Sequence, residues 1–248
     1  MVTWLKRWVL AFIVPRPVVG VLYLPRFLRD WRRFRAIVPP KQRPAWRDLY
    51  PCLGDWTPAT PFDPHYFHQG AWLARNLAGV QPGVHVDVGS SVMMLSVLSA
   101  WAPTVFVDVR PLRASVAGLK AVAGSLLKLP FADRSVTSVS CLHVIEHVGL
   151  GRYGDPLDPS GAERAASELR RILAAGGRLY LSTPVGRERI CFNAHRVFDP
   201  STVSGWFPEC RLISFAYVDD RGVFHADSRP EEAVGLDYGC GMYVFERA

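Results

Sequence analysis

Strand-like and helix-like segments alternate along the middle of the chain, and this alternation limits the folds that the chain can adopt. Apolar segments of strand length lie at residues 84–88, at 104–109, from 136 onward and at 178–184. Helical patterns separate them, and two further strand-like segments follow at 211–219 and 241–247. Strands that alternate with helices form parallel βαβ units. The sequence therefore predicts an α/β fold with one doubly wound, mostly parallel sheet.

Two of the expected helices have recognisable ends. In segment 63–79, Asp63 can cap the N-terminus, Pro64 fits the first turn, and Gly79 is expected to end the helix. The helix in segment 160–173 is expected to be closed by Gly176 and Gly177.

The stretch HVDVGSS, residues 85–91, is the first candidate for a ligand-binding loop. The strand ends at Asp87 and Gly89, and a helix opens at Ser90 and Ser91, whose backbone N–H groups could bind an anion. Asp108 ends the next strand, 19 residues after Gly89, and an acidic residue about 20 residues downstream can bind the hydroxyls of a ribose. A dinucleotide fold would need G-x-G-x-x-G directly after the strand, so that class is disfavoured.

The ordered motifs resemble class I S-adenosylmethionine-dependent methyltransferases, in particular their small-molecule methyltransferase-like branch. The motifs are HVDVG, Asp108, LPF at 129–131, HVIEHV at 143–148 and ELRRILAAGGRLYLSTP at 168–184, and the resemblance spans about residues 65–200. It implies a Rossmann-like sheet of seven strands and S-adenosyl-L-methionine as the cofactor. The cofactor contacts that it implies are Asp87, Gly89, Ser90, Ser91, Asp108, Ser125, Leu126 and Tyr66.

Three features depart from the pattern of that family. Ser90 and Ser91 replace loop glycines, Ser125 stands where an acid often meets the adenine amine, and Thr137 replaces an aspartate before the fourth strand. These departures leave open a rival function, a non-catalytic methyltransferase-like module that binds a glycan or recruits a glycan-assembly partner. A nucleotide-sugar enzyme with another cofactor is a second rival, disfavoured by the missing glycines.

A narrower resemblance extends from about residue 50 to the C-terminus. The segments 54–72, 143–161, 192–200 and 238–245 are similar to a methyltransferase-like family of unknown function found in bacterial surface-polysaccharide gene clusters. This resemblance implies a glycan or lipid-linked glycan as the acceptor. We therefore expect O-methylation in polysaccharide biosynthesis, on the cytoplasmic side of the membrane.

Three histidines lie where a base for a hydroxyl acceptor is expected. His143 and His147 follow the fourth strand of the pattern, and His195 follows the fifth. Ligands of open α/β sheets bind beyond the C-terminal strand ends, and histidine is the usual base near neutral pH. The sequence does not select among the three, and a structural role stays open for each.

The segment GLGRYGDPLDPSG, residues 149–161, is too rich in glycine and proline for regular structure. It is typical of a functional loop, here expected to cover the site, with a rigid surface loop as the alternative. Asp155 in this loop is an alternative base. The residues expected to bind the substrate are Arg152, Tyr153, Asn193 and Arg196.

The positive charge of the chain is concentrated near its N-terminus. The net charge is +7, but residues 1–47 hold eleven basic residues and one acidic residue, so residues 48–248 carry a net −3. We therefore divide the chain into a basic amphipathic segment, 1–47, and a methyltransferase-like domain, 48–248. Because the domain itself is not basic, nucleic acid is not expected as a partner.

The basic segment is expected to contain an amphipathic helix that starts after Pro25 and stops at Pro39 and Pro40. One face of that helix would carry Phe27, Trp31, Phe34 and Val38. The earlier apolar runs 8–14 and 18–24 are shorter than the ~20 residues of a membrane span, and no signal-peptide cleavage site follows them. We expect residues 1–38 to dock on an anionic membrane surface or a partner, with docking on the domain as the alternative. The Pro-rich residues 39–64 are expected to be a linker.

The five cysteines form no CxxC pair and show no Cys/His metal spacing. An odd, scattered set is typical of a reducing compartment. The sequence predicts neither a disulfide nor a metal site.

Overall fold

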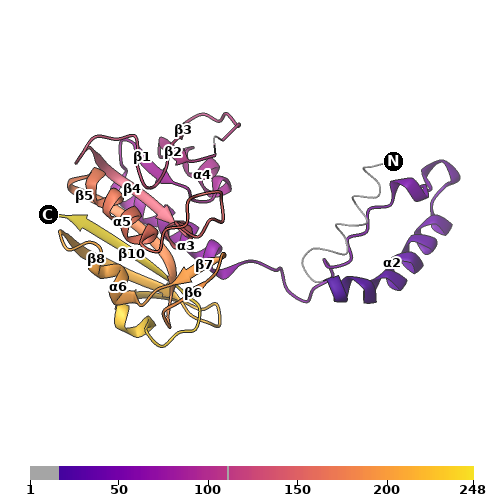
Figure 1. Ribbon diagram of the computed structural model, residues 1–248. Coiled ribbons are helices and arrows are strands. Elements are labelled where there is room, and N and C mark those ends of the chain that lie inside the picture. The colour runs from indigo at the N-terminus through magenta and orange to yellow at the C-terminus, as the bar shows by residue number, and fades with distance from the viewer. Residues whose placement is uncertain (1–16, 111) are drawn as a thin grey trace. The chain divides into compact units, whose positions relative to one another are not determined.

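The computed structural model describes residues 17–110 and 112–248, with side chains from residue 22 onward. Within the described residues the chain divides into two compact units, one that ends at Phe62 and one that spans Asp63–Ala248, and Figure 1 labels their helices and strands. The boundary between them lies after Phe62, later in the chain than the division at residue 47 expected from charge. The apolar run 8–14 lies outside the described residues.

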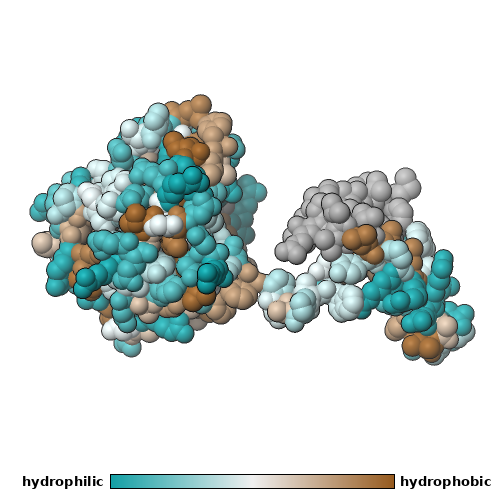
Figure 2. All heavy atoms as spheres, turned by 90° about the horizontal axis from the view of Figure 1, so that it is seen from below, coloured by the Kyte–Doolittle hydropathy of each residue, from teal (hydrophilic) through white to brown (hydrophobic). Residues whose placement is uncertain are grey.

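In the N-terminal unit, helix α2 spans Pro17–Ile37, so Pro25 lies inside the helix and not before its start. The expectation from Pro25 was wrong because an internal proline removes one hydrogen bond and bends a helix without always ending it. Hydrophilic and hydrophobic residues lie side by side on this unit (Figure 2). This mixture agrees with an amphipathic helix.

The segment after α2 folds back on the helix instead of forming a plain linker. It contains two 3-10 turns, η1 (Pro40–Gln42) and η2 (Trp46–Asp48). The rings of Trp31 and Trp46 lie 5.4 Å apart, and Arg35 donates a hydrogen bond to the carbonyl oxygen of Pro44 at 3.1 Å. Trp31, expected on the free apolar face of the helix, is therefore partly covered by its own unit, whereas Phe34 is half exposed.

The second unit is built on an eight-stranded sheet with the order β3-β2-β1-β4-β5-β10-β8-β9. Five strands are parallel: β1 (His85–Val88), β2 (Thr104–Asp108), β3 (Leu119–Ala123), β4 (Val136–Leu142) and β5 (Leu173–Val185). The other three pair in antiparallel fashion: β10 (Gly239–Arg247), β8 (Cys210–Val218) and β9 (Phe224–Ser228). The predicted doubly wound, mostly parallel sheet is confirmed, and β9 is a strand beyond the expected seven.

A small hairpin leaves the main sheet after β5. Strands β6 (Arg189–Cys191) and β7 (His195–Val197) pair only with each other, and α6 (Pro200–Gly205) follows. The turns η3 (Ile145–His147), after β4, and η4 (Pro230–Ala233), before β10, complete the unit. The hairpin places His195 near the carboxyl end of β4, as described below.

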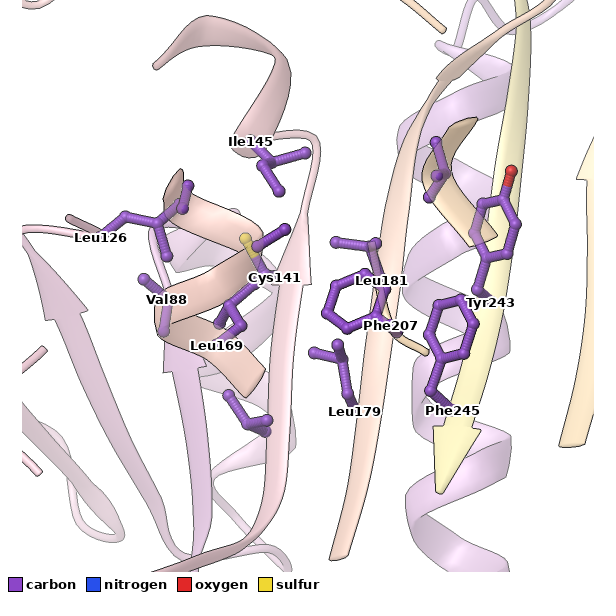
Figure 3. Packing of buried hydrophobic residues seen from close by; sticks show 14 of the residues in the cluster. Val88, Leu126, Cys141, Ile145, Leu169, Leu179, Leu181, Phe207, Tyr243 and Phe245 are labelled. Carbon is purple, nitrogen blue, oxygen red and sulfur yellow. The ribbon is translucent and has the colours of Figure 1, made fainter. Parts of the chain in front are cut away.

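Helices cover both faces of the sheet because neighbouring residues of a strand point to opposite faces. One face packs on α3 (Pro64–Val80) and α4 (Val92–Leu98) through Tyr180 and Met242. The other face packs on α5 (Gly161–Ile172) and the α6 region. Figure 3 shows Leu179 and Leu181 beside Phe207, with Tyr243 and Phe245 on the neighbouring strand. This alternation fixes which side chains face the helices on each side of the sheet.

Two predicted helix ends differ from the structure. Helix α3 begins as predicted, with the carboxylate of Asp63 accepting from the N–H groups of His65 and Tyr66, but it continues past Gly79 to Val80. Gln81 ends it in the left-handed conformation at φ 48°. Helix α5 ends at Ile172, and β5 follows directly, so Gly176 and Gly177 lie in a strand. A glycine signals a helix end only within a residue or two, because other residues can adopt the left-handed turn.

Candidate functional site

A cavity of about 290 Å³ opens at the carboxyl ends of β1, β2 and β4. Its wall is mainly apolar, with a few polar side chains that include Asp108 and His147. Ligands of open α/β sheets bind at this edge of the sheet, beside the point where the strand order reverses. Of the residues predicted for the site, those that line the cavity are Gly89, Asp108, Ser125, Leu126, His143, His147, Tyr153 and Asp155.

Gly89 forms the turn at the floor of the cavity. Its φ is +72°, and a Cβ there would lie 2.9 Å from Cγ1 of Val144. Its N–H donates to the carbonyl oxygen of Val107 at 2.9 Å. The turn therefore requires glycine, both for its backbone conformation and for the close approach of Val144.

Asp87 lies behind the cavity wall and does not face the cavity. Its fully buried carboxylate accepts from the backbone N–H of Ser90 at 3.0 Å and from the hydroxyl of Ser140. The imidazole of His85 bridges Ser140 and Ser138 at 2.8 Å each. This buried chain of polar groups joins β1 to β4 and shapes the loop, which differs from the direct cofactor contact expected of Asp87.

The two loop serines also lie away from the cavity. The hydroxyl of Ser90 is buried and accepts from the N–H of Leu142 at 3.0 Å. Ser91 is the N-cap residue of α4, but its side chain makes no capping hydrogen bond. Of the three residues Gly89, Ser90 and Ser91, Gly89 is thus the one that lines the cavity.

Replacing Asp87 by asparagine is expected to change how stability depends on pH. Burial raises the pKa of Asp87 from 3.8 to about 6, although its hydrogen bonds with Ser140 and Ser90 lower it. A raised carboxyl pKa gives stability that is fully present at low pH and is lost as the pH rises through about 6. Between pH 5 and pH 8, the wild type should lose on the order of 1 kcal/mol relative to Asp87→Asn.

The measurement for Asp87 is urea unfolding of both proteins at pH 5 and pH 8. Taking the difference between the two proteins removes the contribution of other titrating groups, such as His85, whose pKa burial lowers to about 4. A difference that does not change between the two pH values would contradict the buried, raised-pKa carboxylate.

Asp108 is the last residue of β2 and contributes its carboxylate to the cavity. Its carboxylate accepts from the backbone N–H of Arg110 at 2.7 Å and from Nε of the same residue at 3.2 Å. The Arg110 guanidinium lies 4.5 Å from the centre of the Tyr153 ring, a cation–π distance. Arg110 therefore shields the Asp108 carboxylate, and the exposed arginine side chain must move aside before a ligand hydroxyl can bind there.

Ser125 and Leu126 line the cavity from the turn after β3. The hydroxyl of Ser125 accepts from the N–H of Leu127 at 3.1 Å, and Leu126 is buried. Tyr66, by contrast, does not line the cavity. It is half exposed on the first turn of α3, with its ring 5.6 Å from that of His143.

The buried carboxylate of Glu146 lies between two histidines of the segment HVIEHV. Its Oε1 lies 3.0 Å from Nδ1 of His143 and 3.7 Å from Nε2 of His147. Neither carboxylate oxygen of this fully buried residue has a well-aligned hydrogen-bond donor. Sequence reasoning missed Glu146, although its position three residues after His143 was a usable signal.

His143 is engaged through both ring nitrogens. Nδ1 faces Glu146, and Nε2 lies 3.2 Å from Sγ of Cys240. Burial alone would lower the pKa of His143, but Cys240 and the Glu146 carboxylate together raise it well above its ordinary value. A buried imidazole held on both sides in this way is a poor acceptor for a substrate proton.

His147 presents a different geometry. Its Nδ1 donates to the carbonyl oxygen of Ala194 at 2.7 Å, and Nη1 of Arg152 donates to the same oxygen at 2.9 Å. Burial lowers the pKa of His147, although Glu146 and the Ala194 carbonyl raise it in part. The neutral ring thus carries its proton on Nδ1 and an acceptor lone pair on Nε2, which lies 3.5 Å from Nη1 of Arg152.

The loop 149–161, predicted to cover the site, is stabilised by hydrogen bonds between its own backbone N–H groups and Asp155. The Asp155 carboxylate accepts from the N–H groups of Gly149 at 2.6 Å and Tyr153 at 3.3 Å. Burial would raise the pKa of Asp155, but these backbone donors lower it below its ordinary value. A carboxylate with a lowered pKa is a weak base, so its geometry fits loop shaping better than proton transfer.

Arg196, expected to bind the substrate, is buried beneath this loop. Its guanidinium donates to the carbonyl oxygens of Val148 at 2.6 Å and Asp158 at 3.1 Å. The guanidinium also makes longer hydrogen bonds with the backbone carbonyl oxygens of Pro159 and Glu146. With its donors directed to the backbone, Arg196 holds the loop in place and does not face the cavity.

The remaining predicted residues surround the cavity without lining it. His195 packs its ring against Tyr238 with centroids 5.0 Å apart, and burial lowers its pKa. Arg152 and Asn193 are exposed. His195 and Asn193 thus belong to the β6–β7 hairpin and Arg152 to the loop 149–161, while Gly89 and Asp108 line the cavity.

Comparison with known proteins supports the fold and leaves the family open. A family model described as a Caenorhabditis protein of unknown function, DUF268, matches residues 131–212. Among curated proteins, none matches the chain.

Several solved structures share the fold. A chain from the complex of the Haloferax volcanii Trm112 methyltransferase activator with a provisionally assigned methyltransferase is 17% identical, with a TM-score of 0.52, covering 75% of this chain and 90% of that one. The N-methyltransferase NodS of Bradyrhizobium japonicum, in complex with S-adenosyl-L-homocysteine, is 15% identical at a TM-score of 0.50, covering 88% and 97%. The [4+2]-cyclase SpnF is 13% identical at a TM-score of 0.52, covering 71% and 80%. The α/β unit therefore has the Rossmann-like fold of class I methyltransferases.

Proposed function

We propose that the protein is an S-adenosylmethionine-dependent methyltransferase. The observation that carries the proposal is the cavity itself, which joins the Gly89 turn to the Asp108 carboxylate at the carboxyl ends of β1 and β2. NodS, which shares this fold, is a methyltransferase complexed with S-adenosyl-L-homocysteine. This likeness supports a cofactor of the same kind here.

The residues of the cavity fit S-adenosylmethionine in chemical type. Asp108 offers a carboxylate to two ribose hydroxyls, and the apolar side chains of Val109 and Leu126 offer walls for an adenine ring. The Gly89 turn allows the backbone to approach the methionine part without a side chain in the way. When bound, the cofactor would supply an electrophilic methyl group on sulfur.

Within this proposal, His147 is the general base for a hydroxyl acceptor. Its Nδ1 is fixed by the Ala194 carbonyl, so Nε2 can take the hydroxyl proton. Glu146 Oε1, 3.7 Å from Nε2, would stabilise the imidazolium that forms. Alignment of donor and acceptor can supply about 7–11 kcal/mol of the barrier reduction, and a general base about 10²–10⁴-fold in rate.

The acceptor in this proposal is a glycan or a lipid-linked glycan precursor, methylated on oxygen on the cytoplasmic side of the membrane. Its support on this chain is the set of exposed rings and polar groups in the loop 149–161 and in the β6–β7 hairpin. Tyr153 and Phe192 are exposed aromatic residues, on which sugar rings could pack. Arg152 and Asn193, also exposed, could donate hydrogen bonds to sugar oxygens.

Asp108→Ala is expected to weaken binding of S-adenosylhomocysteine by at least about tenfold. The substitution removes the charged acceptor for the ribose hydroxyls, and a hydrogen bond to a charged group contributes about 1.5–3 kcal/mol. Calorimetric titration of the variant and the wild type measures the change.

The matched control for Asp108 is Arg110→Ala. Because Arg110 covers the carboxylate in the structure, its removal should leave the affinity unchanged or raise it. Loss of affinity on replacing Arg110, with none on replacing Asp108, would indicate an anionic ligand and contradict the ribose assignment.

A second candidate function is a non-catalytic module that binds a glycan or a glycan-assembly partner. The ion pair of Asp108 with Arg110 favours it, since the carboxylate is already occupied. The similarity to the [4+2]-cyclase SpnF shows that proteins of this fold are not all named as methyltransferases. Wild-type protein that binds a glycan but not S-adenosylmethionine would establish this alternative.

The basic N-terminal unit is proposed to bind an anionic membrane surface through residues 1–38. Leu24 and Leu28 share a surface groove with the exposed residues Arg29, Arg32 and Arg33, a mixture suited to acyl chains and lipid head groups. In the part of the chain that the structure describes, no helix has the length and hydropathy needed to cross a membrane. The proposed association is therefore peripheral.

Reversing the three arginines to glutamate in the full chain is expected to weaken binding to anionic vesicles on the order of 100-fold. Each basic residue near such a surface contributes about 1 kcal/mol. Sedimentation with anionic vesicles measures binding, and added salt should weaken it in the wild type. Reversal of Arg221 on the α/β unit is the control. Wild-type protein that stays in the supernatant at low salt would refute the membrane proposal.

A further inference from the structure

Three potential metal ligands converge beside the cavity from distant parts of the sequence. His65 lies in the first turn of α3, His143 directly follows β4, and Cys240 is near the start of β10. Their ligand atoms, two imidazole nitrogens and one sulfur, all lie within 4.8 Å of one another. Local spacing in the sequence could not reveal this cluster, and the expectation of no metal site was drawn from local spacing alone.

The distances suit a tetrahedral ion. Zinc binds histidine nitrogen at about 2.0–2.1 Å and cysteine sulfur at about 2.3 Å, which places two such ligand atoms about 3.5 Å apart. Nε2 of His143 lies 3.2 Å from Sγ of Cys240. A small movement of either side chain would therefore admit an ion between them.

Glu146 contacts the ring nitrogen of His143 that does not face Cys240. A histidine that binds a metal usually donates its other ring N–H to a carboxylate, which orients the ring and increases its basicity. Nδ1 of His143 lies 3.0 Å from Oε1 of Glu146. Glu146 is fully buried and its oxygens have no well-aligned donor, so a nearby cation would also offset the cost of its buried charge.

The third ligand, His65, is half-buried on the first turn of α3, and its ring centroid lies 5.4 Å from that of His143. Its ring is stacked on Tyr238 with centroids 5.2 Å apart, and this contact holds it on the side of the cluster.

We propose that His65, His143 and Cys240 bind a Zn²⁺ ion, with Glu146 orienting His143. Two nitrogens and one thiolate form a donor set that zinc prefers, and three protein ligands leave a fourth position for water or a substrate oxygen. His143 also lines the cavity, so the ion lies at the wall of the candidate active site. This site goes beyond the proposed methyl transfer and does not depend on it.

The same residues allow one competing arrangement, a nucleophilic Cys240 activated by His143 and Glu146. Cys240 is fully buried and does not line the cavity, so a substrate would not reach its sulfur. A nucleophilic Cys240 also gives no role to His65, although His65 lies close to both other residues. The metal site accounts for all four side chains.

The test uses the full chain, stripped of metal with a chelator and then incubated with Zn²⁺ or Co²⁺. After gel filtration, one Zn²⁺ per chain should remain bound, as measured by elemental analysis. Co²⁺ should give the absorption of a tetrahedral site together with a thiolate-to-metal charge-transfer band. Cofactor binding is not part of the readout, so the result is independent of the proposed function.

Variants identify the ligands. Cys240→Ser should abolish the charge-transfer band, whereas Cys191→Ser, which alters a cysteine outside the cluster, should retain it. Glu146→Gln should weaken Zn²⁺ binding by about 10–100-fold, and His65→Ala by at least about tenfold. His65 is only half buried, so its variant keeps the test informative if Cys240→Ser does not fold.

Three results would overturn the proposal. The first is wild-type protein that retains no Zn²⁺ after gel filtration. The second is a cobalt spectrum that Cys240→Ser does not change. The third is rapid alkylation of Cys240 by iodoacetamide at neutral pH in protein that binds no metal, which would establish the nucleophilic arrangement.

Discussion

His147→Ala is expected to lower the rate of methyl transfer by about 10²–10⁴-fold, the contribution of a well-placed general base. The reason is that His147 lines the cavity and carries its acceptor lone pair on Nε2, because Nδ1 donates to the Ala194 carbonyl oxygen at 2.7 Å. The rate is measured as transfer of radiolabelled methyl from S-adenosylmethionine to surface-glycan precursors. Affinity for S-adenosylhomocysteine should stay within about threefold, since His147 acts on the acceptor.

The variant His147→Asn distinguishes loss of the base from loss of the hydrogen bond to the Ala194 carbonyl oxygen. The asparagine amide nitrogen can replace Nδ1 as the donor to Ala194, but it supplies no base in place of Nε2. We expect this variant to keep the wild-type melting temperature and to lose as much rate as alanine. Full activity in His147→Asn would exclude His147 as the base and direct attention to His195.

Arg196→Met is expected to destabilise the α/β unit by about 3 kcal/mol. Methionine keeps much of the buried side-chain volume but leaves the carbonyl oxygens of Val148 and Asp158 without their donor. Each buried polar group left without a partner costs about 1–3 kcal/mol. Urea unfolding measures the loss.

Arg164→Met is the control for this prediction. Arg164 also interacts with Asp158, at 2.8 Å from its carboxylate, but the side chain of Arg164 is 63% exposed. Exposed ion pairs contribute about 0–1 kcal/mol, so its loss should be small. Equal destabilisation by the two substitutions would contradict the internal role assigned to Arg196.

The sequence was sufficient to predict the α/β sheet because strand signals are local. The apolar runs ending at Asp108 and Pro184 correspond to β2 and most of β5. The helix ends predicted from Pro25 and Gly79 were wrong for the opposite reason. A proline inside a helix and a left-handed residue such as Gln81 at its end are decided by the whole helix and its packing.

The site was predictable only in part. Motif spacing predicted Gly89 and Asp108 as residues of the site, and both line the cavity. The direction of a side chain does not follow from spacing, so Asp87 and Arg196 were expected to face a ligand and instead contact the interior. Arg110, Glu146 and Cys240 were missed because their importance depends on contacts made through the fold.

The central claim is that the cavity between Gly89 and Asp108 binds S-adenosylmethionine. The most direct measurement is calorimetric titration of the intact protein with S-adenosylmethionine and with S-adenosylhomocysteine. The account predicts one binding site per chain for both ligands, with affinity reduced at least about tenfold by Asp108→Ala. Wild-type protein that binds neither ligand at millimolar concentration would contradict it.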